Sequence, residues 1–327
     1  MDVTTRNRSS RRLAVVATAG VLLLAACGGG ETAAPGADRS LSIATGGTGG
    51  VYYPYGGGMG TVLSEKLGVT ATAQETNASV DNVLLVQDGG ADIAFALGDT
   101  VADAVGGKAQ FEGRQVTLCT LGKLYDNFTQ TVTTSGTGIR GIADLRGKRV
   151  SVGSPGSGTE VIALRLLEAA GINPETDIQR SQLGVGETAQ ALRDGTIDAG
   201  FWSGGLPTGA LVDLATTGQM VLLPTGEYAD ELAAKFGPYY ETEDIPAGTY
   251  QGQTEASPQV VVPNVLIVRS DMPQQLQQDI TRTIFENKAQ LAAVHPAAND
   301  LDPATAGDVG FVEVCPGAKA YFDQATG

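Results

Sequence analysis

The chain has 327 residues, and its 21 Lys and Arg residues against 36 Asp and Glu residues give a formal net charge of −15. Such an acidic chain is a poor partner for nucleic acid, because phosphate contacts need clustered basic side chains. A single histidine and the lack of a free cysteine cluster exclude a histidine-based zinc site, and we expect no metal and no cofactor.

Residues 1–26 are predicted to be a signal peptide, because several arginines precede an apolar run of fourteen residues. That run is too short to span a membrane. The segment LAAC, which ends at Cys27, resembles a bacterial lipobox, in which the cysteine is lipidated; cleavage without lipid is the alternative. Residues 27–40 are rich in glycine and suit a flexible tether. We therefore expect an exported protein, lipid-anchored to the outer face of the cell membrane, with the export route left open.

The first predicted strand, LSIA, is followed by the turn TGGTGG and then by a helical pattern. Glycine at this turn allows the backbone to approach a ligand closely. Adjacent helical residues point about 100° apart, so we expect only one or two of the three following tyrosines to line a ligand cleft. The candidate binding residues in this stretch are Thr48, Gly49, Gly50, Val51, Tyr52 and Tyr53.

The same plan of strand, glycine turn and helix returns later in the chain. Gly46 and Gly153 are 107 residues apart, and the Asp-x-x-Phe motifs that begin at Asp92 and Asp198 are 106 residues apart. Two motif pairs with nearly one offset predict two α/β lobes built on one plan. Ligands of open α/β sheets bind at the carboxyl ends of the strands, so two such lobes face one another across a cleft.

Two helix N-termini are expected to point into this cleft, and each favours an anion through its unpaired N–H groups and partial positive charge. The second lobe contributes Ser157, Gly158 and Thr159, opposite the turn around Thr48. We expect these two stretches to hold a carboxylate. The alternative is ordinary capping, in which Thr48 and Ser157 close their own helices.

Other polar and aromatic residues follow predicted strands in both lobes, and each has a structural alternative. Asp99 either caps a helix or accepts a hydrogen bond from a ligand ammonium. Phe201 and Trp202 either form a cleft wall or divide into a core residue and an exposed one. The further candidate binding residues from these positions are Asn77, Ser79, Asp99, Trp202, Ser203 and Gly204.

Two cysteines remain after the lipobox, Cys119 and Cys315, and an even pair in an exported protein is more often bridged than free. We therefore predict a Cys119–Cys315 disulfide that ties the C-terminus to the first half of the chain. His295 lies at a predicted helix end and is interpreted as a solvated or capping residue. A Ser-His-Asp triad would have to use His295, and no G-x-S-x-G motif accompanies it.

From about Leu41 nearly to its end, the chain resembles the solute receptors of TAXI-type TRAP transporters. The motifs that carry the resemblance are TGGTGGVYYPYGG, TNASVDNVLL, GADIAFALGD, IADLRGKRVSVGSPGSGTE, TIDAGFWSGGLPTGALVDLA, IPAGTY and ENKAQLAAVHPAA. The resemblance implies a type II periplasmic-binding fold of the α/β class, with two lobes, two crossover strands and hinge closure. It also implies a glutamate, glutamine or 2-oxoglutarate ligand, and membrane subunits driven by an ion gradient.

We place lobe borders at residues 41–128 with 256–327 for the first lobe and at 129–255 for the second, and we expect a monomer. An ABC-type binding lipoprotein is an alternative, because it has a similar fold and differs in its partner. A nucleotide-dependent enzyme is a weaker alternative. It depends on GVGETA at residues 184–189, which matches a dinucleotide fingerprint, but no acidic residue follows at the required distance.

Overall fold

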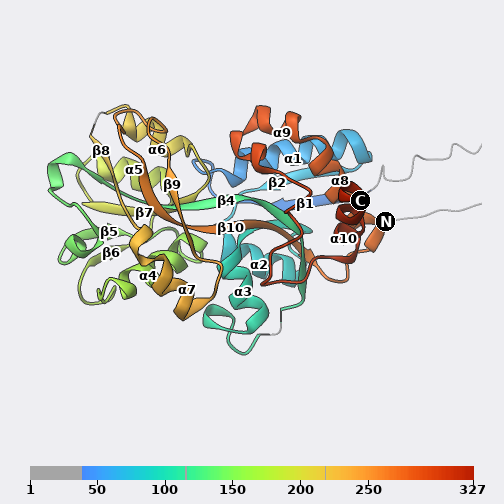
Figure 1. Cartoon of the computed structure of the whole chain (residues 1–327), viewed down its shortest axis with the longest axis horizontal. Coiled ribbons are helices and arrows are strands. Elements are labelled where there is room, and N and C mark those ends of the chain that lie inside the picture. The colour runs from blue at the N-terminus through green and yellow to red at the C-terminus, as the bar shows by residue number, and fades with distance from the viewer. Residues whose placement is uncertain (1–38, 115, 218) are drawn as a thin grey trace, which may run out of the picture. The chain divides into compact units, whose positions relative to one another are not determined.

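A computed structural model describes residues 39–114, 116–217 and 219–327 (Figure 1). The predicted signal peptide, the lipidation of Cys27 and nearly all of the predicted tether lie outside the described residues. No helix in the three described ranges is both long enough and apolar enough to cross a membrane.

Within the described residues, ten strands form one mixed sheet in the order β2-β1-β3-β10-β4-β7-β5-β6, with β8 beside β4 and β9 beside β10. The strands are β1 (Ser40–Ala44), β2 (Thr70–Gln74), β3 (Ile93–Leu97), β4 (Leu118–Thr134), β5 (Arg149–Ser151), β6 (Gln179–Ser181), β7 (Ala199–Gly204), β8 (Met220–Leu223), β9 (Glu241–Ile245) and β10 (Ser257–Arg269). The helices are α1 (Tyr52–Leu67), α2 (Ser79–Asp88), α3 (Gly98–Gly106), α4 (Gly158–Ala169), α5 (Val185–Arg193), α6 (Gly209–Ala215), α7 (Ala229–Phe236), α8 (Gln274–Glu286), α9 (Lys288–Val294) and α10 (Pro316–Thr326).

The sheet consists of two parallel parts joined by two long strands. β2, β1 and β3 are parallel to one another, and so are β6, β5 and β7. β4 and β10 pair antiparallel with each other, and each is antiparallel to the part beside it: β10 to β3 and β4 to β7. We call the part built on β1–β3 lobe 1, the part built on β5–β7 lobe 2, and β4 and β10 the crossover strands.

Helices cover both faces of the sheet in each lobe. Figure 1 shows α1 and α9 on one side of lobe 1, with α2 and α3 on the other. In lobe 2, α5 and α6 lie on one side and α4 and α7 on the other. Parallel sheets with both faces covered bury their inner strands, and the five residues of β3 are all buried.

The structure confirms the internal repeat that the sequence predicts. Asp92, just before β3, accepts a hydrogen bond of 2.8 Å from a backbone N–H of β1. Asp198, just before β7, accepts one of 2.8 Å from a backbone N–H of β5. Gly89 and Gly195 occupy the turns that precede these aspartates, with left-handed φ values of 76° and 67°, which favour glycine. The two lobes therefore have an equivalent aspartate hydrogen bond just before β3 and just before β7.

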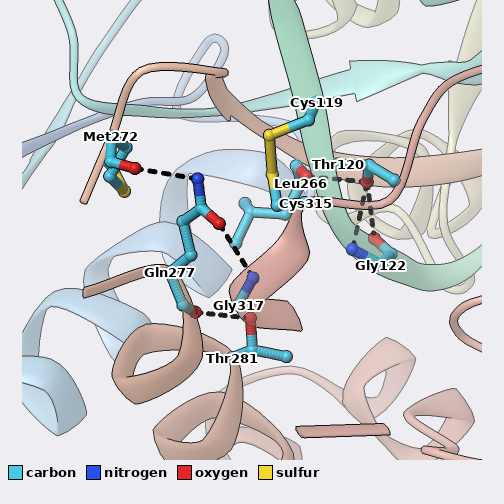
Figure 2. Close-up of a disulfide and its surroundings, with 9 residues drawn as sticks. All are labelled: Cys119, Thr120, Gly122, Leu266, Met272, Gln277, Thr281, Cys315 and Gly317. Carbon is cyan, nitrogen blue, oxygen red and sulfur yellow. Dashed lines mark hydrogen bonds between the residues drawn. A yellow bond between two sulfur atoms is a disulfide. The ribbon is translucent and has the colours of Figure 1, made fainter. Parts of the chain in front are cut away.

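Cys119 of β4 and Cys315, immediately before α10, form a disulfide with a Cα–Cα separation of 5.0 Å (Figure 2). The surrounding contacts also join α8, α10 and the crossover strands. Gln277 of α8 accepts a hydrogen bond from the N–H of Gly317, and Thr120 of β4 donates one to Leu266 O of β10. The C-terminal helix is thereby tied to a crossover strand.

Candidate ligand-binding site

A cavity of about 50 Å³ lies between the two lobes, where the parallel strands of each lobe end. We call it the inner cavity. The structure places at it the following residues that the sequence analysis selected: Gly50, Val51, Tyr52, Asn77, Ser79, Ser157, Gly158, Thr159, Trp202, Ser203 and Gly204. It adds residues that the sequence analysis missed: Gly46, Gly47, Thr76, Ala78, Leu97, Ser154, Gly184 and Val185.

The lobes touch one another around the inner cavity. Ala210 N of lobe 2 donates a hydrogen bond of 3.3 Å to Gly49 O of lobe 1, and Val80 N of lobe 1 donates one of 3.1 Å to Gly156 O of lobe 2. A Cβ atom added to Gly158 would lie 2.5 Å from a methyl carbon of Leu97 in the opposite lobe. The structure is therefore a closed arrangement of the lobes.

The N-terminus of α1 brings free backbone donors to the inner cavity. Val51 precedes α1, and no side chain caps this helix. The N–H groups of Val51 and Tyr52 have no acceptor among the described residues. Thr48 does not cap α1, so the capping alternative is wrong there: the helix begins only at Tyr52, and Thr48 N instead donates a hydrogen bond of 3.4 Å to Glu75 Oε1.

The N-terminus of α4 faces the same cavity from lobe 2. Ser157 caps this helix, because its Oγ accepts a hydrogen bond of 3.1 Å from Glu160 N. The N–H groups of Gly158 and Thr159 have no acceptor within the described residues. Ser157 therefore both caps α4, as the alternative states, and lies at the cavity.

Tyr52 and Trp202 form aromatic walls of the cavity from opposite lobes. Tyr52 stacks on Phe95 with ring centroids 5.0 Å apart, and its hydroxyl donates a hydrogen bond of 2.9 Å to Asn264 Oδ1 on β10. Burial raises the pKa of Tyr52 well above its ordinary value, so its hydroxyl is neutral. Trp202 lies against Gly50, where an added Cβ would be 2.9 Å from the indole ring. Phe201 is a core residue, as one of the two alternatives states. Trp202 is half-buried at the cavity, as the other alternative states.

Asp99 does not lie at the inner cavity, which corrects its selection as a ligand-binding residue. It is fully buried in α3, where its Oδ2 accepts a hydrogen bond of 2.8 Å from the Tyr240 hydroxyl and lies 3.4 Å from Arg165 Nη1 of α4. Arg165 also pairs with Asp103. Burial raises the pKa of Asp99, although the Arg165 guanidinium opposes this. These groups bind the lobes to each other. Asp99 lies in the first turn of α3, whose N-cap position is Leu97, so Asp99 does not cap this helix.

Three more selected residues lie outside the inner cavity. Tyr53 is 36% exposed and does not line the cavity. Thr48 and Gly49 line a second, more open cavity of about 480 Å³, which we call the outer chamber. It adjoins the inner cavity, because both are lined by Gly47, Thr76, Asn77, Ser154, Gly184 and Val185.

The inner cavity carries no charged side chain among the described residues that line it. Its polar groups are backbone N–H groups and neutral side chains. Two helix N-termini, each equivalent to about half a positive charge, are the main source of positive potential there. The site can therefore hold an anion through backbone dipoles, without an arginine or lysine. Among the described residues, no cluster of His, Cys, Asp or Glu is suited to a metal ion.

The mixed α/β sheet with helices on both faces is the fold of solute-binding proteins of known structure. The chain belongs to the NMT1-like family, whose model matches residues 43–325.

Solved structures of low sequence identity have the same fold. PhnD1 from Prochlorococcus marinus, in complex with methylphosphonate, is 11% identical, with a TM-score of 0.53 over 80% of this chain and 91% of that one. An ancestral arginine-binding protein bound to arginine is 16% identical, with a TM-score of 0.51 over 80% and 98%. A binding protein component of an ABC phosphonate transporter from Pseudomonas aeruginosa is 10% identical, with a TM-score of 0.52 over 79% and 78%. At these identities the likeness shows the fold alone.

Proposed function

We propose that the chain is an extracytoplasmic solute receptor that captures a small carboxylate between its lobes and delivers it to membrane transport subunits. The observation that carries this proposal is the convergence of α1 and α4, from opposite lobes, on one cavity. The unpaired N–H groups of Val51, Tyr52, Gly158 and Thr159 suit carboxylate oxygens, and Tyr52 and Trp202 suit the carbon chain of the ligand.

Closure follows from dividing the site between two lobes. Each lobe alone offers half of the hydrogen-bond donors, so the ligand binds the closed state better and shifts the equilibrium toward it. We place the hinge at the border 128/129, within β4, and at the border 255/256, just before β10, so that lobe 1 comprises residues 41–128 and 256–327. The membrane subunits then recognise the closed form.

The finer assignment is to a TAXI-type receptor of a TRAP transporter, which the motifs around Thr48 and Ser157 support. Glutamate, glutamine and 2-oxoglutarate are its proposed ligands. We further propose a monomer that is exported and held at the membrane by a lipid on Cys27. Labelling with a fatty acid tests this anchor: the wild type should be labelled and a Cys27→Ala variant should not.

An ABC-type receptor is the second candidate, and the Pseudomonas aeruginosa phosphonate-transporter component of the same fold favours it. Uptake into cells or vesicles with the cognate membrane subunits separates the two. A TRAP receptor supports uptake that collapses when the ion gradient is dissipated, whereas an ABC receptor supports uptake that needs ATP.

A thermal-shift screen tests the receptor itself, on protein refolded to remove carried-over ligand. The panel contains amino acids, dicarboxylates, 2-oxo acids and sugars. A ligand at one hundred times its dissociation constant adds about 2.7 kcal/mol, which raises the melting temperature by a few degrees. Ser154→Ala, at the cavity, should reduce this shift, whereas Ser270→Ala, on an exposed turn, should not. A panel without any hit would contradict the proposal.

A further inference from the structure

The outer chamber has a charge that the inner cavity lacks. Glu75 and Glu187 line it, and they are the only charged residues among the described residues that line either chamber. Both are exposed, one on each lobe. A solute that enters the inner cavity through the outer chamber therefore passes two carboxylates.

Backbone contacts hold these two carboxylates in place. Glu75 Oε1 accepts a hydrogen bond of 3.4 Å from Thr48 N, and Glu187 Oε2 accepts one of 3.1 Å from Gly184 N. Within the described part of the chain, no lysine or arginine forms an ion pair with either glutamate. Their negative charge is therefore not neutralised by a neighbouring side chain.

The helix N-termini supply a total of about one positive charge to the site. α1 has no acidic residue in its first turn, and Glu160 in the first turn of α4 is paired with Arg180. These two N-termini, at about half a charge each, match one carboxylate. The other two N-termini at the site are already partly offset. Glu187 lies in the first turn of α5, and Gly156 O accepts hydrogen bonds from the N–H groups of Val80 and Asp81 in α2.

We propose that Glu75 and Glu187 set the charge selectivity of the site, so that its ligand carries one carboxylate and no second uncompensated negative charge. This inference rests on the proposed receptor function. A dianion leaves one charge unmatched by the helix N-termini and is repelled twice as strongly by the two glutamates. Within the proposed ligands, glutamine and then glutamate are favoured over 2-oxoglutarate.

Isosteric pairs of ligands test the proposal, because an amide and a carboxylate have nearly the same shape. We would measure dissociation constants by calorimetry at low ionic strength for glutamine against glutamate and for glutaramate against glutarate. The amide should bind more tightly in each pair. The double variant Glu75→Gln, Glu187→Gln should leave glutamine unchanged, tighten a singly charged ligand about threefold, and tighten a doubly charged ligand about tenfold.

Glu112→Gln is the matched control, since Glu112 is exposed and lines neither chamber. Equal or tighter binding of the carboxylate member in each pair, with no change in the double variant, would overturn the charge selectivity and leave the receptor function intact. Failure of all four compounds, and of the wider melting screen, would overturn the receptor function and this inference with it.

Discussion

Replacing Gly158 with alanine tests whether ligand binding requires the closed arrangement of the lobes. The added Cβ would lie 2.5 Å from Leu97 Cδ1 and 2.7 Å from Ser79 Oγ, both in the opposite lobe. Ordinary carbon contacts are about 3.5 to 4.0 Å, so the lobes cannot approach as they do in the wild type. Ser79 has little freedom to move, because its Oγ accepts a hydrogen bond of 3.1 Å from Leu97 N.

The added methyl group should destabilise the closed arrangement of the lobes but not the folded state itself. Overpacking of this size costs about 1 to 3 kcal/mol. An opened hinge relieves it, so the dissociation constant should rise about 5- to 150-fold while the melting temperature without ligand changes little. Calorimetric titration gives the affinity, and small-angle scattering with ligand reports whether the lobes close.

Gly57→Ala is the matched control, because Gly57 lies in α1 and an added Cβ meets nothing within 4 Å. This variant should bind as the wild type does. If Gly158→Ala binds within twofold of the wild type, the reasoning that couples binding to closure is refuted.

Three further variants test how the fold is held together. Arg165→Met leaves Asp99 buried without its cation and should lower the free energy of unfolding by about 3 kcal/mol in urea titrations; an unchanged midpoint would contradict the structural role of this pair. Burial lowers the pKa of His295 from its ordinary 6.5, so the unfolded chain takes up the proton first and stability falls as the pH drops below about 6.5. His295→Asn should flatten that fall between pH 7.5 and 5.5, and an identical slope in both proteins would refute it. Replacing Cys119 and Cys315 with alanine should lower the unfolding free energy by about 2 to 4 kcal/mol, and equal stability of this variant and the oxidised wild type would count against the bridge.

The repeated lobes were predictable because their patterns are local. Asp92 and Asp198 each stand before a buried strand, and the spacing between them appears directly in the sequence. Ser157 was recognisable as a cap, because Glu160 follows it three residues later in a capping pattern. The alternative that Thr48 caps α1 was wrong, since a run of glycines leaves the first helical residue undetermined.

Contacts that depend on tertiary structure could not be predicted from the sequence. Asp99 has the position of a strand-end binding residue, and only its approach to Arg165, 66 residues away, makes it part of the interlobe contact. Gly184 and Val185 were noticed as part of a nucleotide fingerprint, whereas the structure places them at the inner cavity. Their position at another strand-to-helix turn, between β6 and α5, was the signal that could have found them.

The measurement that tests the central claim most directly is an amide chemical-shift map of the protein, recorded with and without the compound that gives the largest melting shift. The account predicts that the amide protons of Val51, Tyr52, Gly158 and Thr159 move downfield, because they become donors to a carboxylate. Unchanged positions for these four amides, with shifts elsewhere in the chain, would contradict it.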